Sequence, residues 1–199
     1  RRSLRYIFSS NLSLIILLIA GLVVYGETPL LPMQILWVGL MTMTFPSLAL
    51  EVEPKERNIM MREPRPMLKT VLNTKGLVLT LIEGFLMAFA ALVAYVLGKQ
   101  INPNTAQTMA FMTIGFVQLF HAFNLRNSQS VLGRDFFSNR SFFPAVLLSG
   151  VLLVITVLLD PLHKIFGTRL LGAQQWGLIF ILAFGIVLVT EIRKLFIKE

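Results

Sequence analysis

Polar residues within apolar runs are the first candidates for chemistry in this sequence. Thr42 lies four residues before Pro46, inside a run with a helical pattern. Because proline has no N–H group and its ring crowds the carbonyl group four residues back, Pro46 leaves the Thr42 carbonyl oxygen without its helical donor. In a bilayer, such backbone is stable only where it is buried in protein or lines a cavity. The pattern indicates either a broken helix beside a transport site or a packed proline kink.

Four more polar residues in apolar runs are candidates for the same site. For Asn11, a ligand role and a hydrogen bond between helices are equally supported. Gln118 and His121 are three residues apart and share a helix face, which suits either a site or a helix contact. Glu83 is the carboxylate placed well inside an apolar run. It can carry a proton or a cation, but the favoured interpretation is an ion pair with an arginine near the membrane interface.

The composition places these residues in an integral membrane protein. Of 199 residues, 55% are hydrophobic and 14% are charged, and the mean hydropathy is +0.74, whereas a soluble domain has about 25% charged residues. The absence of cysteine excludes disulfides and thiolate metal sites. We therefore predict an all-α polytopic bundle that forms a single transmembrane domain over residues 1–199. Its six predicted spans are about residues 6–25, 33–50, 76–97, 106–123, 142–159 and 175–190, each near the 20 residues that a helical span needs.

The basic residues predict how these spans are oriented. Of the 18 Lys and Arg residues, all but Lys99, Lys164 and Arg169 lie at the two termini or in the second and fourth links. Cytoplasmic loops are the ones enriched in Lys and Arg, so both termini are expected in the cytoplasm, and the plasma membrane is the expected location. The net charge of +8 is then a consequence of topology, which argues against a nucleic-acid partner.

Several segments in order carry a family resemblance. The chain contains RYIFSSN, then LPMQILWVGLMTMTFPSLAL, then EPKERNIMMREPR, and later LDPLHKIFG and QWG. Together these segments resemble the C-terminal membrane region, the last six helices, of type II P-type cation-transporting ATPases, the group of calcium and sodium/potassium pumps. The resemblance covers the whole chain, and it is specific because the order and the spacing match together.

The resemblance assigns the family's ion-site positions to residues of this chain. The positions that keep a compatible residue are Asn11, Thr42, Gln118 and the helix-breaking Pro46. The positions that lose a ligand are Leu14, Gly39 and Met43, which stand where the family has Glu, Asn and Asp. Because a hard divalent cation binds several charged oxygen ligands, two sites of the calcium-pump kind are not expected. A single site, a monovalent ion, a proton coupled to Glu83 or an organic substrate all remain open.

The resemblance implies a function that this chain does not complete alone. Phosphoryl transfer in the family uses a D-K-T-G-T motif, a T-G-E-S loop and a nucleotide-binding domain, none of which occurs in this sequence. The chain is therefore expected to be the membrane half of an ATP-driven cation pump, with ion-pathway residues on the first, second and fourth spans. It holds no cofactor itself; ATP and Mg²⁺ bind in other domains of the pump.

Expected partners are the lipid bilayer, the transported cation and the N-terminal part of the same pump, which supplies four helices and the cytoplasmic domains. The alternative function is a non-catalytic membrane scaffold or regulator that has lost the ion-site carboxylates. A secondary transporter is less consistent with the sequence, because no internal repeat is detectable.

For the pump, Thr42→Ala or Asn11→Ala is expected to lower ion-stimulated ATPase activity far more than Ser149→Ala.

Overall fold

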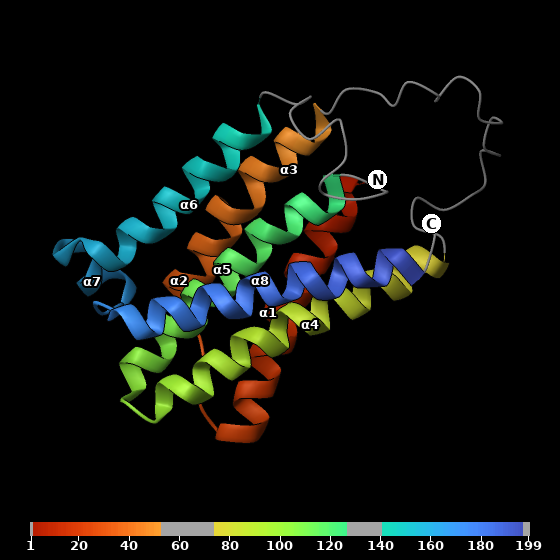
Figure 1. The fold of residues 1–199 in the computed structure, drawn as a ribbon. Helices are drawn as coiled ribbons and strands as arrows, with labels where there is room; N and C mark the ends of the chain where they lie inside the picture. Colours follow the sequence, from red (N-terminus) through yellow and green to blue (C-terminus); the bar gives the residue numbers. More distant parts are fainter. Residues whose placement is uncertain (1, 53–73, 127–140, 197–199) are drawn as a thin grey trace, which may run out of the picture.

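The computed structural model describes residues 2–52, 74–126 and 141–196, and these residues fold into helices joined by short links (Figure 1). No β-strand occurs among them, which confirms the all-α prediction. The helices are α1 (Arg2–Tyr25), α2 (Pro32–Trp37), the π-helix η1 (Val38–Met43), α3 (Thr44–Glu51), α4 (Thr74–Lys99), α5 (Pro103–Arg126), α6 (Phe142–Leu158), α7 (Asp160–Phe166) and α8 (Ala173–Phe196).

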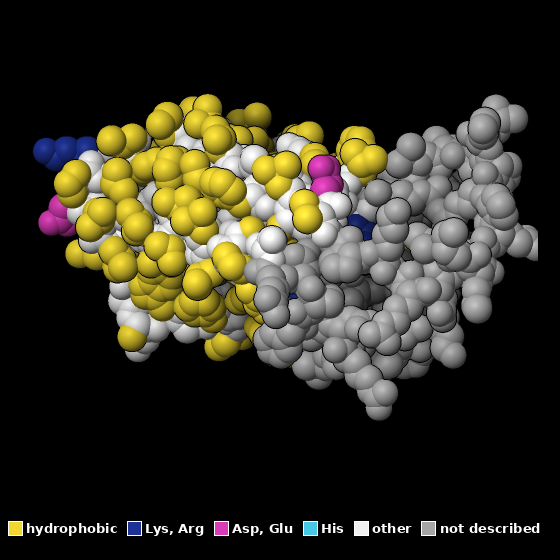
Figure 2. Space-filling model, turned by 90° about the horizontal axis from the view of Figure 1, so that it is seen from above, with side chains coloured by type: hydrophobic (Ala, Val, Ile, Leu, Met, Phe, Trp, Pro, Cys, Tyr) yellow, Lys and Arg dark blue, Asp and Glu magenta, His cyan; other side chains and the backbone are white. Residues whose placement is uncertain are grey.

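Within the described residues, five helical segments are long and apolar enough to cross a membrane, and α2, η1 and α3 together form one of them. Helix α6 makes a sixth if it is combined with α7, which turns away from it by 94°. Figure 2 shows hydrophobic side chains over most of the described part of one face, with charged side chains toward its two ends. Large apolar residues such as Val23, Leu147 and Ile181 are 69–77% exposed, a surface suited to lipid. The chain is a multi-pass integral membrane protein.

Helix α5 occupies the centre of the bundle. Within its most apolar stretch 89% of the residues are buried, compared with 33% for α1 and 22% for α8, and α5 packs against α1, α4, α6 and α8. A polar side chain on α5 is therefore enclosed by protein on nearly every side. This position places Gln118 and His121 inside the bundle, where polar groups require partners.

The second span is interrupted, but the irregular turns precede Pro46. Residues Val38–Met43 form a π-helix, and Pro46 is the third residue of the regular helix α3. The prediction of a break at Pro46 itself therefore needs correction. The helix is π-helical at Val38–Met43 and is regular at the proline. The missing N–H of Pro46 frees the Thr42 carbonyl, and the preceding turns change from α-helical to π-helical bonding. Such π-helical turns are rare and are frequent at functional sites.

The turn between α4 and α5 depends on a close backbone approach at Gly98. A Cβ atom at this position would lie 2.5 Å from the Cα atom of Ala106 and 3.0 Å from its backbone nitrogen. Because backbone atoms cannot move aside as a flexible side chain can, we expect Gly98→Ala to lower the free energy of unfolding by about 1–3 kcal/mol. Thermal unfolding in detergent measures this, with Gly150→Ala as the control. A Cβ atom at Gly150 would make an ordinary contact of 3.7 Å with Leu119, so equal effects would contradict the packing argument.

Candidate functional site

The interrupted span and α5 are joined by a buried hydrogen bond between two of the predicted site residues. The Thr42 hydroxyl oxygen lies 2.8 Å from Gln118 Oε1 and 2.7 Å from the Val38 carbonyl oxygen. Because the hydroxyl group has one hydrogen, it donates to one of these acceptors at a time. Both Thr42 and Gln118 are fully buried. The structure therefore brings together two residues that the sequence places 76 positions apart.

The same glutamine also connects the site to α1. Gln118 Nε2 donates to the Ser10 carbonyl oxygen at 3.2 Å and to Ser13 Oγ at 3.3 Å. Its amide group thus bonds to two other helical segments through its oxygen and its nitrogen. Fully satisfied polar networks of this kind fix the relative positions of the helices that they join. Gln118 is consequently a structural link as well as a candidate ligand.

Side-chain hydroxyl groups bond to the carbonyl oxygens around the interruption. The Tyr6 hydroxyl on α1 donates to the Thr42 carbonyl oxygen, the group that Pro46 leaves without a helical donor. On the other side, Ser149 Oγ on α6 lies 2.7 Å from the Met41 carbonyl oxygen and 3.0 Å from the Ala145 carbonyl oxygen, and it donates its one hydrogen to one of them at a time. Each carbonyl oxygen has two lone pairs, so one remains for a second donor or a cation while the hydroxyl group bonds to the other. Ser149 therefore contacts the residue that precedes Thr42, and the smaller loss of activity expected for Ser149→Ala stays a prediction.

Tyr6 was not among the candidates from sequence, although the sequence held a signal for it. A tyrosine hydroxyl group in an apolar span needs a hydrogen-bond partner when it is buried, and Tyr6 is fully buried. Its position next to Arg5 in the RYIFSSN segment gave no indication that the partner would be 36 residues away. The identity of that partner follows only from the packing of α1 against the interrupted span.

Asn11 lies on a different face of α1 from the residues that contact Thr42 and Gln118. Its side chain is exposed and its Nδ2 donates to the Ile7 carbonyl oxygen of the same helix at 2.9 Å. Among the described residues, no hydrogen bond joins Asn11 to Thr42 or Gln118. The structure thus places two of the three polar positions together and leaves the third on the outside of the bundle.

The three positions at which the resemblance implies a lost ligand have different surroundings. Leu14 and Met43 are both only 6% exposed and belong to the hydrophobic core. Gly39 is partly exposed, and an added Cβ atom there would meet nothing within 4 Å. Space for a side chain therefore remains at Gly39, whereas apolar groups occupy the other two positions.

Glu83 forms the ion pair that the sequence analysis favoured, and its partner is Arg5. The Glu83 side chain is 1% exposed, and both of its oxygens accept hydrogen bonds from the Arg5 guanidinium group, one of them from Nε at 3.0 Å. His121 Nε2 lies 3.6 Å from Glu83 Oε2 and 3.1 Å from Ser9 Oγ. The cluster therefore joins α1, α4 and α5 and carries both signs of charge.

Tyr6 connects this charged cluster to the interruption. Its ring stacks on the ring of His121, with centroids 6.2 Å apart and planes 27° from parallel, while its hydroxyl group bonds to the Thr42 carbonyl oxygen. A movement of α1 that shifts Tyr6 would thus change both the contact with His121 and the hydrogen bond to the Thr42 carbonyl oxygen. This is a physical connection between the titratable groups and the broken span, made by a single side chain.

The ligand set at the interruption is neutral in the part of the chain that the structure describes. No group of three His, Cys, Asp or Glu residues suited to a metal ion occurs there. The available oxygens are the backbone carbonyls of the π-helix, the Thr42 and Ser13 hydroxyl groups and the Gln118 amide. Such oxygens are typical ligands for hard cations, but high affinity for a divalent ion also needs carboxylates.

Comparison with known proteins gives a consistent family assignment. A family model described as "Cation transporting ATPase, C-terminus" matches residues 27–196. The "Calcium-transporting ATPase" of Bacillus subtilis (strain 168) is 34% identical over 90% of this chain and 20% of its own length. The "Calcium-transporting ATPase 1" of Bacillus cereus is 30% identical over 98% of this chain and 24% of its own length. The "Calcium-transporting ATPase type 2C member 2" of Mus musculus is 30% identical over 98% of this chain and 21% of its own length. The chain spans about a fifth to a quarter of these relatives.

Proposed function

Because the chain belongs to the cation-transporting ATPases and corresponds to their C-terminal membrane region, we propose that it forms the C-terminal half of the membrane domain of an ATP-driven cation pump. The observation that carries this proposal is the family match over residues 27–196, which contains the interrupted span, α4, α5 and the last spans. ATP and Mg²⁺ bind in the cytoplasmic domains of that pump. The N-terminal part of its membrane domain packs against this chain.

In this pump, the described half contributes neutral oxygens to a single cation site. Thr42 and Gln118 lie together at the interruption, and the Thr42 carbonyl oxygen offers the lone pair that the Tyr6 hydroxyl group does not use. The family positions Leu14, Gly39 and Met43 carry no charge, so the carboxylates come from the N-terminal half. The exposed face of α1 that carries Asn11 packs against that half. Calcium is the first cation to test, because the relatives named above are calcium-transporting ATPases.

The proposed topology has both termini in the cytoplasm of a plasma-membrane protein. The start of α1 and the end of α8 lie toward the same side of the bundle (Figure 1), as an even number of spans requires, and the basic residues favour the cytoplasm for that side. Reporter tags at the two ends of the chain are expected to give the same cytoplasmic signal. Signals from opposite sides would contradict six spans.

The experiment that tests the proposed function is an ion screen of ATPase activity in vesicles that contain the intact protein. Calcium, manganese, sodium and potassium are each titrated, and phosphoenzyme formation is measured in parallel. A single site predicts stimulation by one cation with a Hill coefficient near one, because cooperative binding needs at least two sites. Two-site stimulation would contradict the proposed ligand set.

One observation favours the alternative, a scaffold or regulator without transport. The carbonyl oxygens of Met41 and Thr42 already accept hydrogen bonds from Ser149 and Tyr6, so the interruption is stabilised without any ion. If no cation stimulates ATPase activity and no phosphoenzyme forms, the scaffold function is supported and the pump function is excluded.

A further inference from the structure

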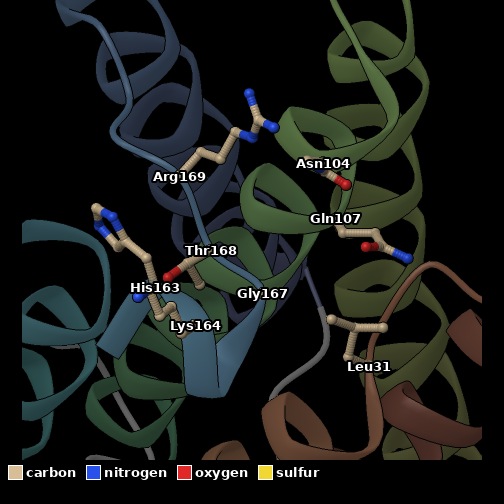
Figure 3. A pocket seen from close by; sticks show the side chains of 8 residues that line it. All are labelled: Leu31, Asn104, Gln107, His163, Lys164, Gly167, Thr168 and Arg169. Atoms are coloured by element: carbon tan, nitrogen blue, oxygen red, sulfur yellow. The ribbon is translucent and has the colours of Figure 1, made fainter. Parts of the chain in front are cut away.

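A polar cavity of about 430 Å³ lies between the α1–α2 link, the start of α5 and the loop that joins α7 to α8 (Figure 3). It is at the end of the bundle away from the start of α1 and the end of α8 (Figure 1). Its polar and charged lining consists of Lys164, Arg169, His163, Asn104, Gln107 and Thr168. None of the described residues that line it is acidic, so the cavity presents cations and hydrogen-bond donors.

We propose that this cavity binds a phosphate-bearing anion, either the headgroup of an anionic phospholipid or a free phosphate ion. The binding does not depend on the pump function proposed above, because it needs only the folded membrane domain. The ligand chemistry is the same for both sources: a phosphate group with one or two negative charges, bound by a guanidinium group and an ammonium group.

The distribution of charge supports an anionic ligand. Only three basic residues lie on this end of the protein in the predicted topology, and Lys164 and Arg169, two of the three, line the cavity. The third, Lys99, has its own partner, since its Nζ lies 2.9 Å from Glu27 Oε2. Neither Lys164 nor Arg169 has a carboxylate partner in the described part of the chain. Basic residues are the minority on the non-cytoplasmic side, and two of the three in this chain line the same cavity.

The nearest acidic group does not neutralise the cavity. Asp160 Oδ1 lies 3.7 Å from His163 Nδ1, and its side chain is 90% exposed. His163 Nε2 lies 2.6 Å from the Val157 carbonyl oxygen and must donate to it, because a carbonyl only accepts. The Val157 carbonyl oxygen thereby fixes the orientation of the His163 ring. The positive charge of the cavity comes from Lys164 and Arg169.

The loop that carries Arg169 is fixed before any ligand binds. The Arg169 backbone N–H donates to Thr108 Oγ1 at 3.1 Å, and the Thr168 hydroxyl group donates to the Thr156 carbonyl oxygen. With the Asn104 amide turned so that its oxygen faces the guanidinium group, that oxygen accepts bonds from Arg169 Nη2 at 3.1 Å and Nε at 3.2 Å. These bonds use two of the five guanidinium N–H groups and leave three for a phosphate.

Figure 3 shows the two cationic side chains on different sides of the cavity. Arg169 extends from the loop toward Asn104 at the start of α5, and Lys164 lies on the α7 side of the cavity. Next to these two cations, Ile165 is 54% exposed and Leu170 is 62% exposed. Apolar surface beside a cationic cavity suits a lipid whose acyl chains lie along the helices while its phosphate group contacts the cations.

The first arm of the test measures lipid binding to the intact protein in nanodiscs. Phosphatidylglycerol is titrated into a phosphatidylcholine background, and lipids retained by the protein are counted by native mass spectrometry. We expect the double variant Lys164→Gln/Arg169→Gln to lose one retained phosphatidylglycerol and to raise the half-saturating mole fraction about ten-fold or more, because charge-assisted hydrogen bonds are lost. Lys99→Gln is the matched control, since it removes a positive charge from the same end outside the cavity.

The second arm distinguishes the source of the phosphate group. Inorganic phosphate is titrated by calorimetry into the protein in phosphatidylcholine nanodiscs. Binding of phosphatidylglycerol without phosphate assigns the site to a lipid headgroup, and saturable phosphate binding that the double variant abolishes assigns it to a free anion. The proposal is overturned if neither ligand binds saturably, or if the double variant behaves like Lys99→Gln. Both readouts are independent of ATPase activity, so failure of the pump function leaves the test valid.

Discussion

Replacing Thr42 with Ala is expected to lower the cation-stimulated ATPase activity of the proposed pump by about ten-fold or more. The substitution removes the hydroxyl donor that lies 2.8 Å from Gln118 Oε1, and it removes a candidate ligand from the interruption. An acceptor left unsatisfied in a buried site costs about 1–3 kcal/mol, and each 1.4 kcal/mol is a factor of ten in rate or affinity. The measurement is ATPase activity against cation concentration in vesicles.

The variant Thr42→Ser separates the hydroxyl group from the methyl group. It retains the donor to Gln118, so we expect most of the activity to remain. Thr190→Ala is the matched control, because Thr190 is also buried and its hydroxyl group donates to a carbonyl oxygen of its own helix, that of Ile186 at 2.9 Å. If Thr190→Ala reduced activity as much as Thr42→Ala, or if Thr42→Ser were no better than Thr42→Ala, the site assignment would be wrong.

The loss in Thr42→Ala has two parts that can be measured separately. If Thr42 acts as a ligand, the half-stimulating cation concentration rises by more than the loss of stability accounts for. If Thr42 only orients Gln118, the stability of the contacts between α5 and α1 falls together with activity. Gln118 Nε2 donates to α1 at Ser10 and Ser13, so a disturbed amide group affects both helices.

The positions of the helical spans were predictable because a bilayer restricts each span to a long apolar run. A helical span needs about 20 apolar residues, and the runs are separated by prolines, glycines and charges, so the predicted span at residues 33–50 is observed as Pro32–Glu51. The loss of a helical donor to the Thr42 carbonyl oxygen was also predictable, because it follows from the covalent structure of Pro46. These inferences use only local sequence, and local sequence was sufficient for them.

The details of the interruption depend on tertiary contacts and were not predictable. The π-helix at Val38–Met43 is only six residues long, so the pattern of apolar residues cannot separate it from an α-helix. The hydroxyl donors of Tyr6 and Ser149 come from helices that are distant in sequence. For Asn11, sequence cannot distinguish a polar residue that faces the bundle from one that faces outward, because both kinds of face are apolar in membrane helices.

The identity of the residue that pairs with Glu83 also depends on tertiary contacts. The sequence favoured an arginine partner for Glu83, since an unpaired carboxylate inside a span is costly. It did not select Arg5, which lies 78 residues earlier. Only the packing of α1 against α4 identifies the pair, and it also places His121 of α5 beside the same carboxylate.

Replacing Glu83 with Gln is expected to destabilise the protein by about 3–5 kcal/mol, the usual cost of removing one partner from a buried ion pair. The variant keeps the shape of the side chain and removes the negative charge that faces the Arg5 guanidinium group, whose side chain is 13% exposed. The measurement is the free energy of unfolding in detergent. The double variant Arg5→Met/Glu83→Gln removes both charges and is expected to recover much of this loss.

The matched control is Glu27→Gln, which removes the acid from an exposed ion pair. The Glu27 side chain is 54% exposed and pairs with Lys99. The hydrogen bond from Lys99 lowers the pKa of the Glu27 carboxyl below its usual value, so this group is ionised at neutral pH, where both variants are compared. Exposed pairs contribute little to stability, so we expect a much smaller change than for Glu83→Gln. Equal changes, or a coupling energy near zero between Arg5 and Glu83 in the double-variant cycle, would contradict a buried structural pair.

The same variant distinguishes the two roles considered for Glu83. A structural ion pair predicts that Glu83→Gln lowers stability and that the pH profile of the remaining ATPase activity is unchanged. A proton carrier predicts the opposite: activity loses its dependence on pH in the range where the carboxylate titrates, because glutamine cannot release a proton. Tyr6 lies between this cluster and the Thr42 carbonyl oxygen, so Tyr6→Phe adds a further discriminating result. If proton release is coupled to the interruption through the Tyr6 hydroxyl group, Tyr6→Phe changes the pH profile while the Arg5–Glu83 pair and its stability are retained.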